Sequence, residues 1–211
     1  MIEPTKDCHN CPRLKSFRIN NRKKFPEFYN APVKSFGLIN SELLIVGLAP
    51  GLNGANKTGR PFTGDFAGKV LYPALIKSNL AKGAYEEKKS DSIKLLNCRI
   101  TNAVRCVPPQ NKPQGTEIRN CQIFLNNEIN YMKNIKGILT LGVVAHNSIL
   151  GIMKLTKNKY KFKHGKIHQL NKKLWLANSY HCSRYNINTG RLTIKQFEKV
   201  INKVSIKLKN F

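Results

Sequence analysis

The chain has 211 residues, of which 41% are hydrophobic, so it is long enough to bury the core of a single domain. Its 37 Lys and Arg residues against 11 Asp and Glu residues give a formal net charge of +26, which favours a polyanion such as nucleic acid as the partner. No apolar run approaches about eighteen residues and the first residues lack the apolar core of a secretory signal, so we expect a cytoplasmic protein without a membrane span.

The first chemistry-bearing feature is a cysteine pair in the N-terminal arm, residues 1–36. Cys8 and Cys11 are separated by two residues, a spacing that brings two thiolates together on one turn. Cys106 and Cys121, with fourteen residues between them, would complete a four-thiolate site. In an intracellular chain such a set favours a metal over disulfides, and the residues alone leave Zn²⁺ and an iron–sulfur cluster open. The alternative is that all six cysteines are reduced and metal-free.

The next feature is an apolar strand, predicted at 43–47, that runs into a glycine-rich loop. The carboxyl end of a strand is where open α/β sheets bind ligands. The loop matches neither the Gly-x-Gly-x-x-Gly fingerprint nor a Walker loop, so a nucleotide cofactor is unsupported. Asp65 is the only carboxylate between Glu42 and Glu86, which makes it a candidate for chemistry. Capping of a helix that begins near Phe66 is the alternative role, and both roles can hold.

The remaining elements follow as an alternation of strands and helices. Further strands are predicted at 98–104, 137–142 and 174–179, and helices at 67–80, 117–134, 143–153 and 193–209. The strands are short and nearly continuously apolar, as is typical of a parallel sheet buried on both faces. The pattern predicts a three-layer α/β/α fold around a mainly parallel four-stranded sheet, within one domain. Residues 82–94 are predicted to be a polar connector.

Three polar residues fall just beyond or near the ends of predicted strands: Asp65, Asn102 and His181. Polar groups that converge on one edge of a sheet are what a binding site requires. Taken alone, Asn102 is more simply explained as a turn-forming asparagine, and a lone histidine at a strand end is more often structural.

The second half of the chain carries the excess of positive charge. Residues 154–173 contain eight lysines and no acid, and Lys195, Lys199, Lys203 and Lys207 recur at a four-residue spacing along the last predicted helix. Drift of the composition in an A/T-rich genome is the alternative cause of so many lysines. However, Glu198 is the only acid beyond Glu128, and drift alone would not remove the others. We therefore expect a phosphate-binding surface whose affinity falls steeply with salt.

Four blocks of the chain match one family in that family's own order. The first is Gly47-Leu-Ala-Pro-Gly together with Asn56-Lys-Thr-Gly-Arg-Pro-Phe-Thr-Gly-Asp65, and the last is Ser179-Tyr-His-Cys-Ser-Arg-Tyr-Asn-Ile-Asn-Thr-Gly-Arg-Leu-Thr193. Between them lie Thr101-Asn-Ala-Val-Arg-Cys-Val-Pro-Pro109 and Leu141-Gly-Val-Val-Ala145. The blocks resemble the family 5 uracil-DNA glycosylases, which are iron–sulfur members of the uracil-DNA glycosylase superfamily. One departure is Cys182, which stands where the family usually has a proline after the motif histidine.

The resemblance implies a uracil-DNA glycosylase-like fold and a [4Fe-4S] cluster. It places the ligands of the cluster at the four cysteines Cys8, Cys11, Cys106 and Cys121. We expect the cluster to be structural, because it would tie the N-terminal arm to the loop at Pro108-Pro109. Cys98 and Cys182 are then left over, and Cys98 is expected in the core.

The resemblance also implies a monofunctional glycosylase that flips uracil out of DNA, hydrolyses its N-glycosidic bond and leaves an abasic site. Catalysis falls to Asp65, which positions or deprotonates a water, to His181, which donates to the pyrimidine oxygen, and to Asn102, which reads the uracil edge. The other residues of the base pocket are Gly47, Ala49, Pro50, Gly51 and Phe62, with Phe62 stacking on the base. The DNA contacts are Asn56, Arg60, Ser183, Arg184 and Arg191, with Tyr185 entering the groove beside them.

The implied substrate is DNA that contains uracil or other deaminated bases, with hypoxanthine and oxidised pyrimidines as further candidates. We expect a monomer. Two other functions stay open at this point: a non-catalytic basic DNA-binding module stapled by a four-cysteine metal site, and a protein-interaction role in replication or repair. Alanine at Asp65 and His181 would separate the enzyme from the module.

Overall fold

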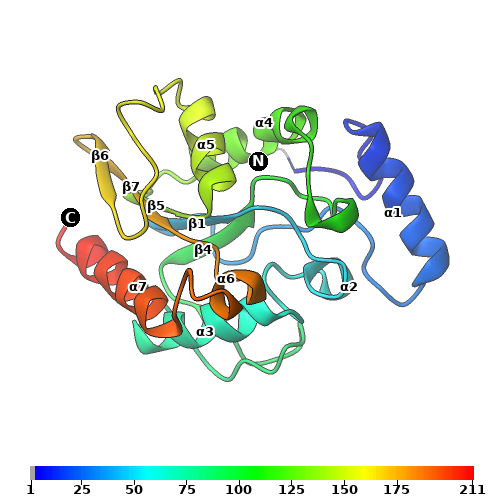
Figure 1. Ribbon diagram of the computed structural model, residues 1–211, viewed down its shortest axis with the longest axis horizontal. Coiled ribbons are helices and arrows are strands. Elements are labelled where there is room, and N and C mark those ends of the chain that lie inside the picture. Colours follow the sequence, from blue (N-terminus) through cyan, green and yellow to red (C-terminus); the bar gives the residue numbers. More distant parts are fainter. Residues whose placement is uncertain (1–2) are drawn as a thin grey trace.

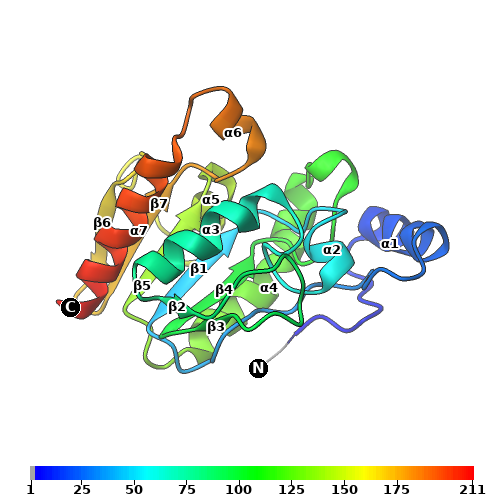
Figure 2. The same ribbon diagram turned by 90° about the horizontal axis from the view of Figure 1, so that it is seen from below.

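Residues 3–211, the part of the chain that the computed structural model describes, form a central sheet covered by helices on both faces (Figures 1 and 2). The strand order is β4-β1-β5-β7-β6. β1 (Leu43–Gly47), β4 (Cys98–Asn102), β5 (Gly137–Leu141) and β7 (Leu174–Ser179) are parallel, whereas β6 (Ile167–Asn171) pairs with β7 in the antiparallel direction. A separate two-stranded pair joins β2 (Ala81–Lys82) to β3 (Lys94–Leu95).

The helices divide between the two faces of the sheet. α3 (Phe66–Lys77) and α7 (Ile194–Lys209) lie below the sheet in Figure 1, whereas α4 (Gly115–Tyr131) and α5 (Val143–Ile152) lie above it. α1 (Pro12–Lys24) lies at the end of the molecule far from β6, and α2 (Ala55–Thr58) and α6 (Arg184–Asn188) are short helices near the carboxyl edge of the sheet. A short 3₁₀ helix, η1 (Pro109–Asn111), precedes α4.

The parallel strands are largely apolar, and β1 is entirely so, because both of their faces are buried. In β1, Leu43 and Ile45 pack into the cluster that contains α3 and α7, while Leu44 and Val46 pack into the cluster that contains α4 and α5. Side chains that alternate between the faces of a strand produce this division. A strand that is buried on both faces can hold its end rigidly, and that end carries the site described below.

The N-terminal arm runs beside the outer edge of β4. The backbone N–H of Phe36 donates to the carbonyl oxygen of Ile100 at 2.9 Å, and the N–H of Ile100 donates back to Phe36 at 2.7 Å. The N–H of Val33 also donates to the carbonyl oxygen of Arg105, at 2.7 Å. The arm therefore pairs with β4 on the side that β1 leaves open.

A buried carboxylate joins α4 to β4 and the segment that follows it. Glu128 accepts from Nε of Arg99 at 2.6 Å and from the guanidinium of Arg105 at 2.5 Å. All three side chains are buried, and the two positive neighbours hold the pKa of Glu128 below its usual value despite burial. Because Arg105 directly precedes Cys106, the ion pairs also fix where that cysteine lies.

The predicted fold class is confirmed, with one more strand in the central sheet than expected and the additional pair β2-β3 beside it. All four predicted strands and all four predicted helices are present, with ends that differ by a few residues. The strand β6 and the helix α1 were missed. β6 lies at an edge, where only His168 is buried, and its sequence contains too few apolar residues to indicate a strand. No helix within residues 3–211 combines the length and apolar character that a membrane span requires.

Candidate active site

A cavity of about 550 Å³ opens at the carboxyl edge of the parallel strands. Its walls come from the loop after β1, from the start of α3, from the ends of β4 and β7, and from α6. Asp65, Asn102 and His181, which the sequence placed near strand ends, all line it. Ala49, Pro50, Gly51 and Phe62 line it as well. The volume lies within the range of small-molecule binding sites.

Asp65 is held in place as the N-cap of α3. Its Oδ1 accepts from the backbone N–H of Gly68 at 3.2 Å, so the capping role suggested by the sequence is confirmed. The other oxygen, Oδ2, faces the glycine-rich loop, where a methyl group on Gly54 would lie only 2.3 Å away. Burial raises the pKa of Asp65, and its hydrogen bonds from the Gly68 and Ala67 backbones oppose that rise. The carboxylate is thus rigid and poorly solvated.

Phe62 and His181 form the inner wall of the cavity. Their ring centroids lie 5.8 Å apart and their planes are inclined by 26°. The backbone of Phe62 has a φ of +53°, a left-handed conformation that is unusual for an aromatic residue. A methyl group on Gly47 would lie 2.6 Å from Cζ of Phe62 and 2.4 Å from Oδ1 of Asn102. Gly47 therefore does not line the cavity itself but gives two cavity residues the space they occupy.

His181 sits on a loop that several contacts hold. Asn186 donates from Nδ2 to the carbonyl oxygen of His181 at 2.8 Å, and Ser183 caps α6 by accepting from the Asn186 N–H at 3.3 Å. The surrounding walls bury the imidazole and lower its pKa to about 4. At neutral pH the ring is therefore uncharged, with one N–H to donate and one nitrogen to accept.

Cys182 follows His181 and points away from the cavity. Its side chain is fully buried, and Sγ donates to the carbonyl oxygen of Ala67 in the first turn of α3 at 3.6 Å. Burial raises the pKa of this thiol, which keeps it protonated at neutral pH. The cysteine thus connects the loop of His181 to the helix that Asp65 caps.

Asn102 is the last residue of β4 and lies beside Gly47 in the register of the sheet. Only 4% of the residue is exposed, and that small surface faces the cavity. Within the described residues its side-chain amide has no hydrogen-bond partner. A buried amide without a partner is available to a ligand that offers both a donor and an acceptor.

Two residues predicted to contact DNA are buried instead. Asn56 is 1% exposed and donates from Nδ2 to Oδ1 of Asn30 at 2.9 Å. Arg60 is 4% exposed and is paired with both carboxylate oxygens of Asp91, at 2.7 and 2.6 Å. Neither side chain can reach a phosphate from these positions, so the prediction of a direct DNA contact is wrong for both. Both side chains instead stabilise the conformation of the motif loop through these internal contacts.

The other predicted DNA contacts lie on the surface near the cavity. Ser183 and Arg184 line its rim, and Arg184 rests over the ring of Phe66, with 5.5 Å between the guanidinium carbon and the ring centroid. Arg191 is exposed and rests over Tyr180 at 4.6 Å. All eight lysines of residues 154–173 are exposed, as are Lys195, Lys199 and Lys203 on α7. Their contact with DNA stays a prediction.

Asn111 is a cavity residue that the sequence analysis did not single out. It belongs to η1 and takes a φ of +57°, which follows a φ of +54° at Gln110. These left-handed residues carry the chain from the Pro108-Pro109 loop to the rim of the cavity. The proline-rich stretch signals a turn, but nothing in the sequence shows where that turn points. Tyr185, at the same rim, is 72% exposed.

The four cysteines singled out from the sequence pack together at the junction of α1, α4 and the loop after β4. Cys11, Cys106 and Cys121 are buried in one cluster, with Cys8 packed against it. Arg18, itself buried, donates to Sγ of Cys106 at 3.4 Å and to the carbonyl oxygen of Cys8 at 2.8 Å. Among the described residues no three or more His, Cys, Asp or Glu side chains stand in an arrangement that would hold a single metal ion.

Comparison with known proteins identifies related sequences along most of the chain. A family model described as the uracil DNA glycosylase superfamily matches residues 34–205. A type-5 uracil-DNA glycosylase of Thermus thermophilus is 37% identical over 199 residues, which cover 92% of this chain and 90% of that protein. A type-5 uracil-DNA glycosylase of Pyrobaculum aerophilum is 34% identical over 203 residues, covering 94% and 88%. A type-4 uracil-DNA glycosylase of the same organism is 29% identical over 168 residues, covering 79% and 71%.

Proposed function

This chain belongs to the uracil DNA glycosylase superfamily, and we propose that it removes uracil from DNA by hydrolysing the N-glycosidic bond and leaving an abasic site. The observation that carries the proposal is the cavity at the edge of the sheet. It brings a half-buried carboxylate, an uncharged histidine and an unpartnered amide together around an aromatic ring. Each of these groups has a part in cleaving a glycosidic bond.

Binding of the base comes first. An enzyme that acts on a glycosidic bond must extrude the nucleotide from the helix, and the cavity is large enough for the extruded base. Phe62 offers its ring to one face of the base, and the amide of Asn102 can pair with a uracil edge that carries a carbonyl and an imide N–H. A rigidly held amide favours this edge over that of cytosine, which presents a different order of donors and acceptors.

Stabilisation of the leaving base follows from His181. As the bond breaks, negative charge gathers on the pyrimidine oxygens, and a hydrogen-bond donor aimed at that charge lowers the barrier. The lowered pKa of His181 keeps the imidazole neutral, so it acts as a donor through its N–H and does not deliver a proton from an imidazolium.

Asp65 acts on the opposite side of the bond. Cleavage places positive charge on the sugar, and a fixed carboxylate both stabilises this charge and orients the attacking water. The cap at the start of α3 fixes the carboxylate, and the absence of a side chain on Gly54 leaves room for Oδ2 against the glycine-rich loop. The active form is the ionised one, which must exist despite a raised pKa.

DNA binding falls to the rim of the cavity and to the basic surfaces. Tyr185 and Arg184 on α6 stand beside the cavity, where an exposed aromatic ring can enter the base stack and a guanidinium can bind a phosphate. The exposed lysines of residues 154–173 and α7 add charge that DNA would neutralise.

The relatives named type-5 are 34–37% identical to this chain and those named type-4 are 29–30% identical, which supports a type-5 assignment and the wider base range that it implies.

We further propose that Cys8, Cys11, Cys106 and Cys121 hold a [4Fe-4S] cluster. The fit rests on the packing of all four cysteines into one region and on Arg18, whose Nε is buried without a hydrogen-bond partner among the described residues. A buried cation with spare donor capacity suits an anionic cluster of iron and thiolates. The cluster would act as a cross-link between the arm and the loop that carries Asn111.

A cleavage assay tests the enzyme. Anaerobically purified protein is incubated with duplexes that carry one uracil opposite guanine, one uracil opposite adenine or one hypoxanthine, and the products are treated with alkali. We expect strand breaks only after alkali, strongly reduced in Asp65→Ala and His181→Ala. Glu27→Gln, which removes an exposed carboxylate, serves as the control and should behave like the parent. No breaks with any substrate would leave a non-catalytic DNA-binding module.

A further inference from the structure

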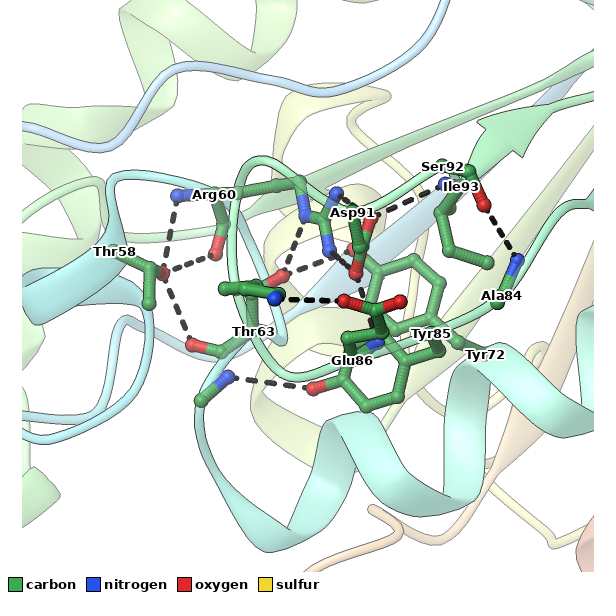
Figure 3. A network of polar contacts seen from close by, with 12 residues as sticks. Thr58, Arg60, Thr63, Tyr72, Ala84, Tyr85, Glu86, Asp91, Ser92 and Ile93 are labelled. Carbon is green, nitrogen blue, oxygen red and sulfur yellow. Dashed lines mark hydrogen bonds and ion pairs between the residues drawn. The ribbon is translucent and has the colours of Figure 1, made fainter.

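The segment 82–94, predicted from sequence to be a polar connector, folds against the loop that carries Phe62 and Asp65 (Figure 3). Its most polar stretch, residues 86–92, contains the fully buried side chain of Asp91. A carboxylate without exposure in a surface connector needs a compensating partner. That partner is Arg60, from the middle of the first motif.

The Arg60–Asp91 pair is the anchor of the connector. Arg60 donates to both carboxylate oxygens of Asp91 and also, from Nε, to Oγ1 of Thr63 at 2.7 Å. Asp91 accepts in addition from the backbone N–H groups of Glu86 at 3.2 Å and Ile93 at 3.1 Å. The Asp91 carboxylate thus stabilises the turn of the connector and also binds it to the motif. Its contact with Arg60 is bidentate, which gives the ion pair a defined geometry.

Two tyrosine rings continue the contact toward Phe62. Tyr85 of the connector stacks on Tyr72 of α3, with 4.6 Å between centroids and 25° between planes. The guanidinium of Arg60 lies over Tyr72, 5.3 Å from its centroid. Figure 3 shows the two rings side by side beneath the ion pair. The stack places the hydroxyl of Tyr85 at the backbone of the motif.

The hydroxyl of Tyr85 bridges two backbone groups on either side of Thr63. It donates to the carbonyl oxygen of Phe62 at 3.2 Å and accepts from the N–H of Gly64 at 3.3 Å. Burial raises the pKa of Tyr85 to about 12, so the hydroxyl keeps its proton and remains a donor. Gly68 makes room for the bridge, because a methyl group there would fall 2.2 Å from the tyrosine oxygen.

This bridge acts at the strained point of the motif. The left-handed backbone of Phe62 is strained and persists only where surrounding contacts determine it. The carbonyl that Tyr85 binds belongs to Phe62 itself, and the N–H that it binds lies one residue before Asp65. A shift of this backbone would move both the ring that faces the base and the carboxylate that caps α3.

We propose that Tyr85 is a positioning residue: its hydroxyl fixes Phe62 and the approach to Asp65 in the geometry that base excision requires, with Arg60 and Asp91 anchoring the connector that carries it. The inference rests on the proposed function, since it concerns the same site. Tyr85 does not touch the cavity and acts through Phe62. Tyr85 acts on His181 through the ring of Phe62, which His181 contacts.

The test compares Tyr85→Phe with Tyr29→Phe. Both changes delete one hydroxyl that donates to a backbone carbonyl, but the Tyr29 hydroxyl binds Pro32 at 3.4 Å, away from Phe62. We expect Y85F to lower the single-turnover rate of uracil excision about tenfold, because small misplacements of reacting groups are costly. Its melting temperature and its affinity for undamaged duplex should stay close to those of the parent. Y29F should keep the rate within about twofold.

A double-mutant cycle then asks whether Tyr85 acts through Phe62. In a Phe62→Ala background, Y85F should change the rate by less than about twofold, because the ring that it positions is gone. A Y85F rate equal to the parent rate would overturn the proposal. So would the same tenfold loss in the F62A background, or a rate loss in Y85F that is fully explained by a lowered melting temperature and the resulting loss of folded protein.

A readout without substrate separates this inference from the proposed function. The ring of Phe62 shifts the magnetic resonance signals of the His181 imidazole, since the two rings stack. Y85F should move these signals, and Y29F should not. If the parent protein released no base, the proposed function would fail, and unmoved His181 signals in Y85F would separately overturn the positioning role.

Discussion

Gly54 faces Asp65 so closely that a methyl group on its Cα would lie 2.3 Å from Oδ2 and 2.8 Å from Cγ of the carboxylate. Because Gly54 has no side chain, the Asp65 carboxylate can lie directly against its backbone. Two motif segments eleven residues apart in sequence therefore pack closely against each other at this point.

Replacement of Gly54 by alanine should therefore impair excision without removing any functional group. The methyl group must push Asp65 away from its position, and we expect the single-turnover rate to fall about a hundredfold. Gly115→Ala is the matched control, because the nearest atom to its new methyl group is the end of the Arg119 side chain at 3.5 Å. An unchanged rate in G54A would mean that the position of Asp65 does not matter for the reaction.

Above pH 5, the pH dependence of the rate should follow Asp65 alone. Asp65 must be ionised to act, and burial raises its pKa above the usual 3.8, so the rate should rise with pH through that raised value. His181, with a pKa of about 4 in place of 6.5, is already neutral above pH 5, so no second limb should appear near pH 6.5. Single-turnover rates between pH 4 and 8 measure this. A fall in rate as the pH rises through 6.5 would show that a charged His181 is needed.

The Arg60–Asp91 pair should contribute strongly to stability. Asp91→Asn removes one charge of a buried pair and leaves the Arg60 guanidinium without its counter-charge, which costs about 3–5 kcal/mol of the free energy of unfolding. Glu86→Gln, which breaks an exposed pair with Lys88, should cost less than about 1 kcal/mol. Denaturant unfolding of the two variants measures the difference. Equal midpoints would show that the buried pair is no stronger than the exposed one.

Iron content should distinguish the cluster cysteines from the others. Cys106→Ser should lose most of the iron and the visible absorbance of the purified protein, because it removes one of four proposed ligands. Cys98→Ser is the control: Cys98 is equally buried, but its Sγ donates to the carbonyl oxygen of Leu80 in the core. Metal analysis of both proteins, prepared anaerobically in parallel, decides the matter. Similar iron in the two variants, or zinc in place of iron, would contradict the cluster.

Arginine residues should divide into those that bind DNA and those that hold the fold. Arg184→Ala should weaken binding to duplexes of any sequence and reduce the slope of log affinity against log salt concentration by about 1. Arg60→Lys, which keeps the charge of a buried residue, should leave that slope unchanged. Fluorescence anisotropy at several salt concentrations measures both. An equal reduction in the two variants would place Arg60 at the DNA after all.

The sequence was sufficient for those parts of the fold and site that depend on local pattern. β1 could be predicted because burial on both faces leaves no polar residue in it, whereas β6 could not, since an exposed edge strand tolerates histidine, glutamine and asparagine. Asp65 could be identified because a lone carboxylate in a basic loop is conspicuous.

Long-range pairing accounts for the errors. A basic residue in a glycine-rich motif suggests a phosphate ligand, but the partner of Arg60 lies 31 residues further along, in a stretch whose composition indicates a solvated connector. The same holds for Asn56, whose partner is Asn30. Asn111 reaches the cavity only because two left-handed residues turn the chain toward it, and side-chain identity does not encode that direction.

The pairing of Phe36 with Ile100 bears on how the protein avoids self-association. β4 is the outermost parallel strand, and its apolar residues would offer a ready template to a strand from another molecule if its N–H and carbonyl groups were bare. The arm occupies two of these groups, and Cys11 and Leu14 near its start pack against α4 and the segment that follows β4. Loss of that hold, whether by truncation or by damage to the cysteines, would uncover the strand and lead to aggregation.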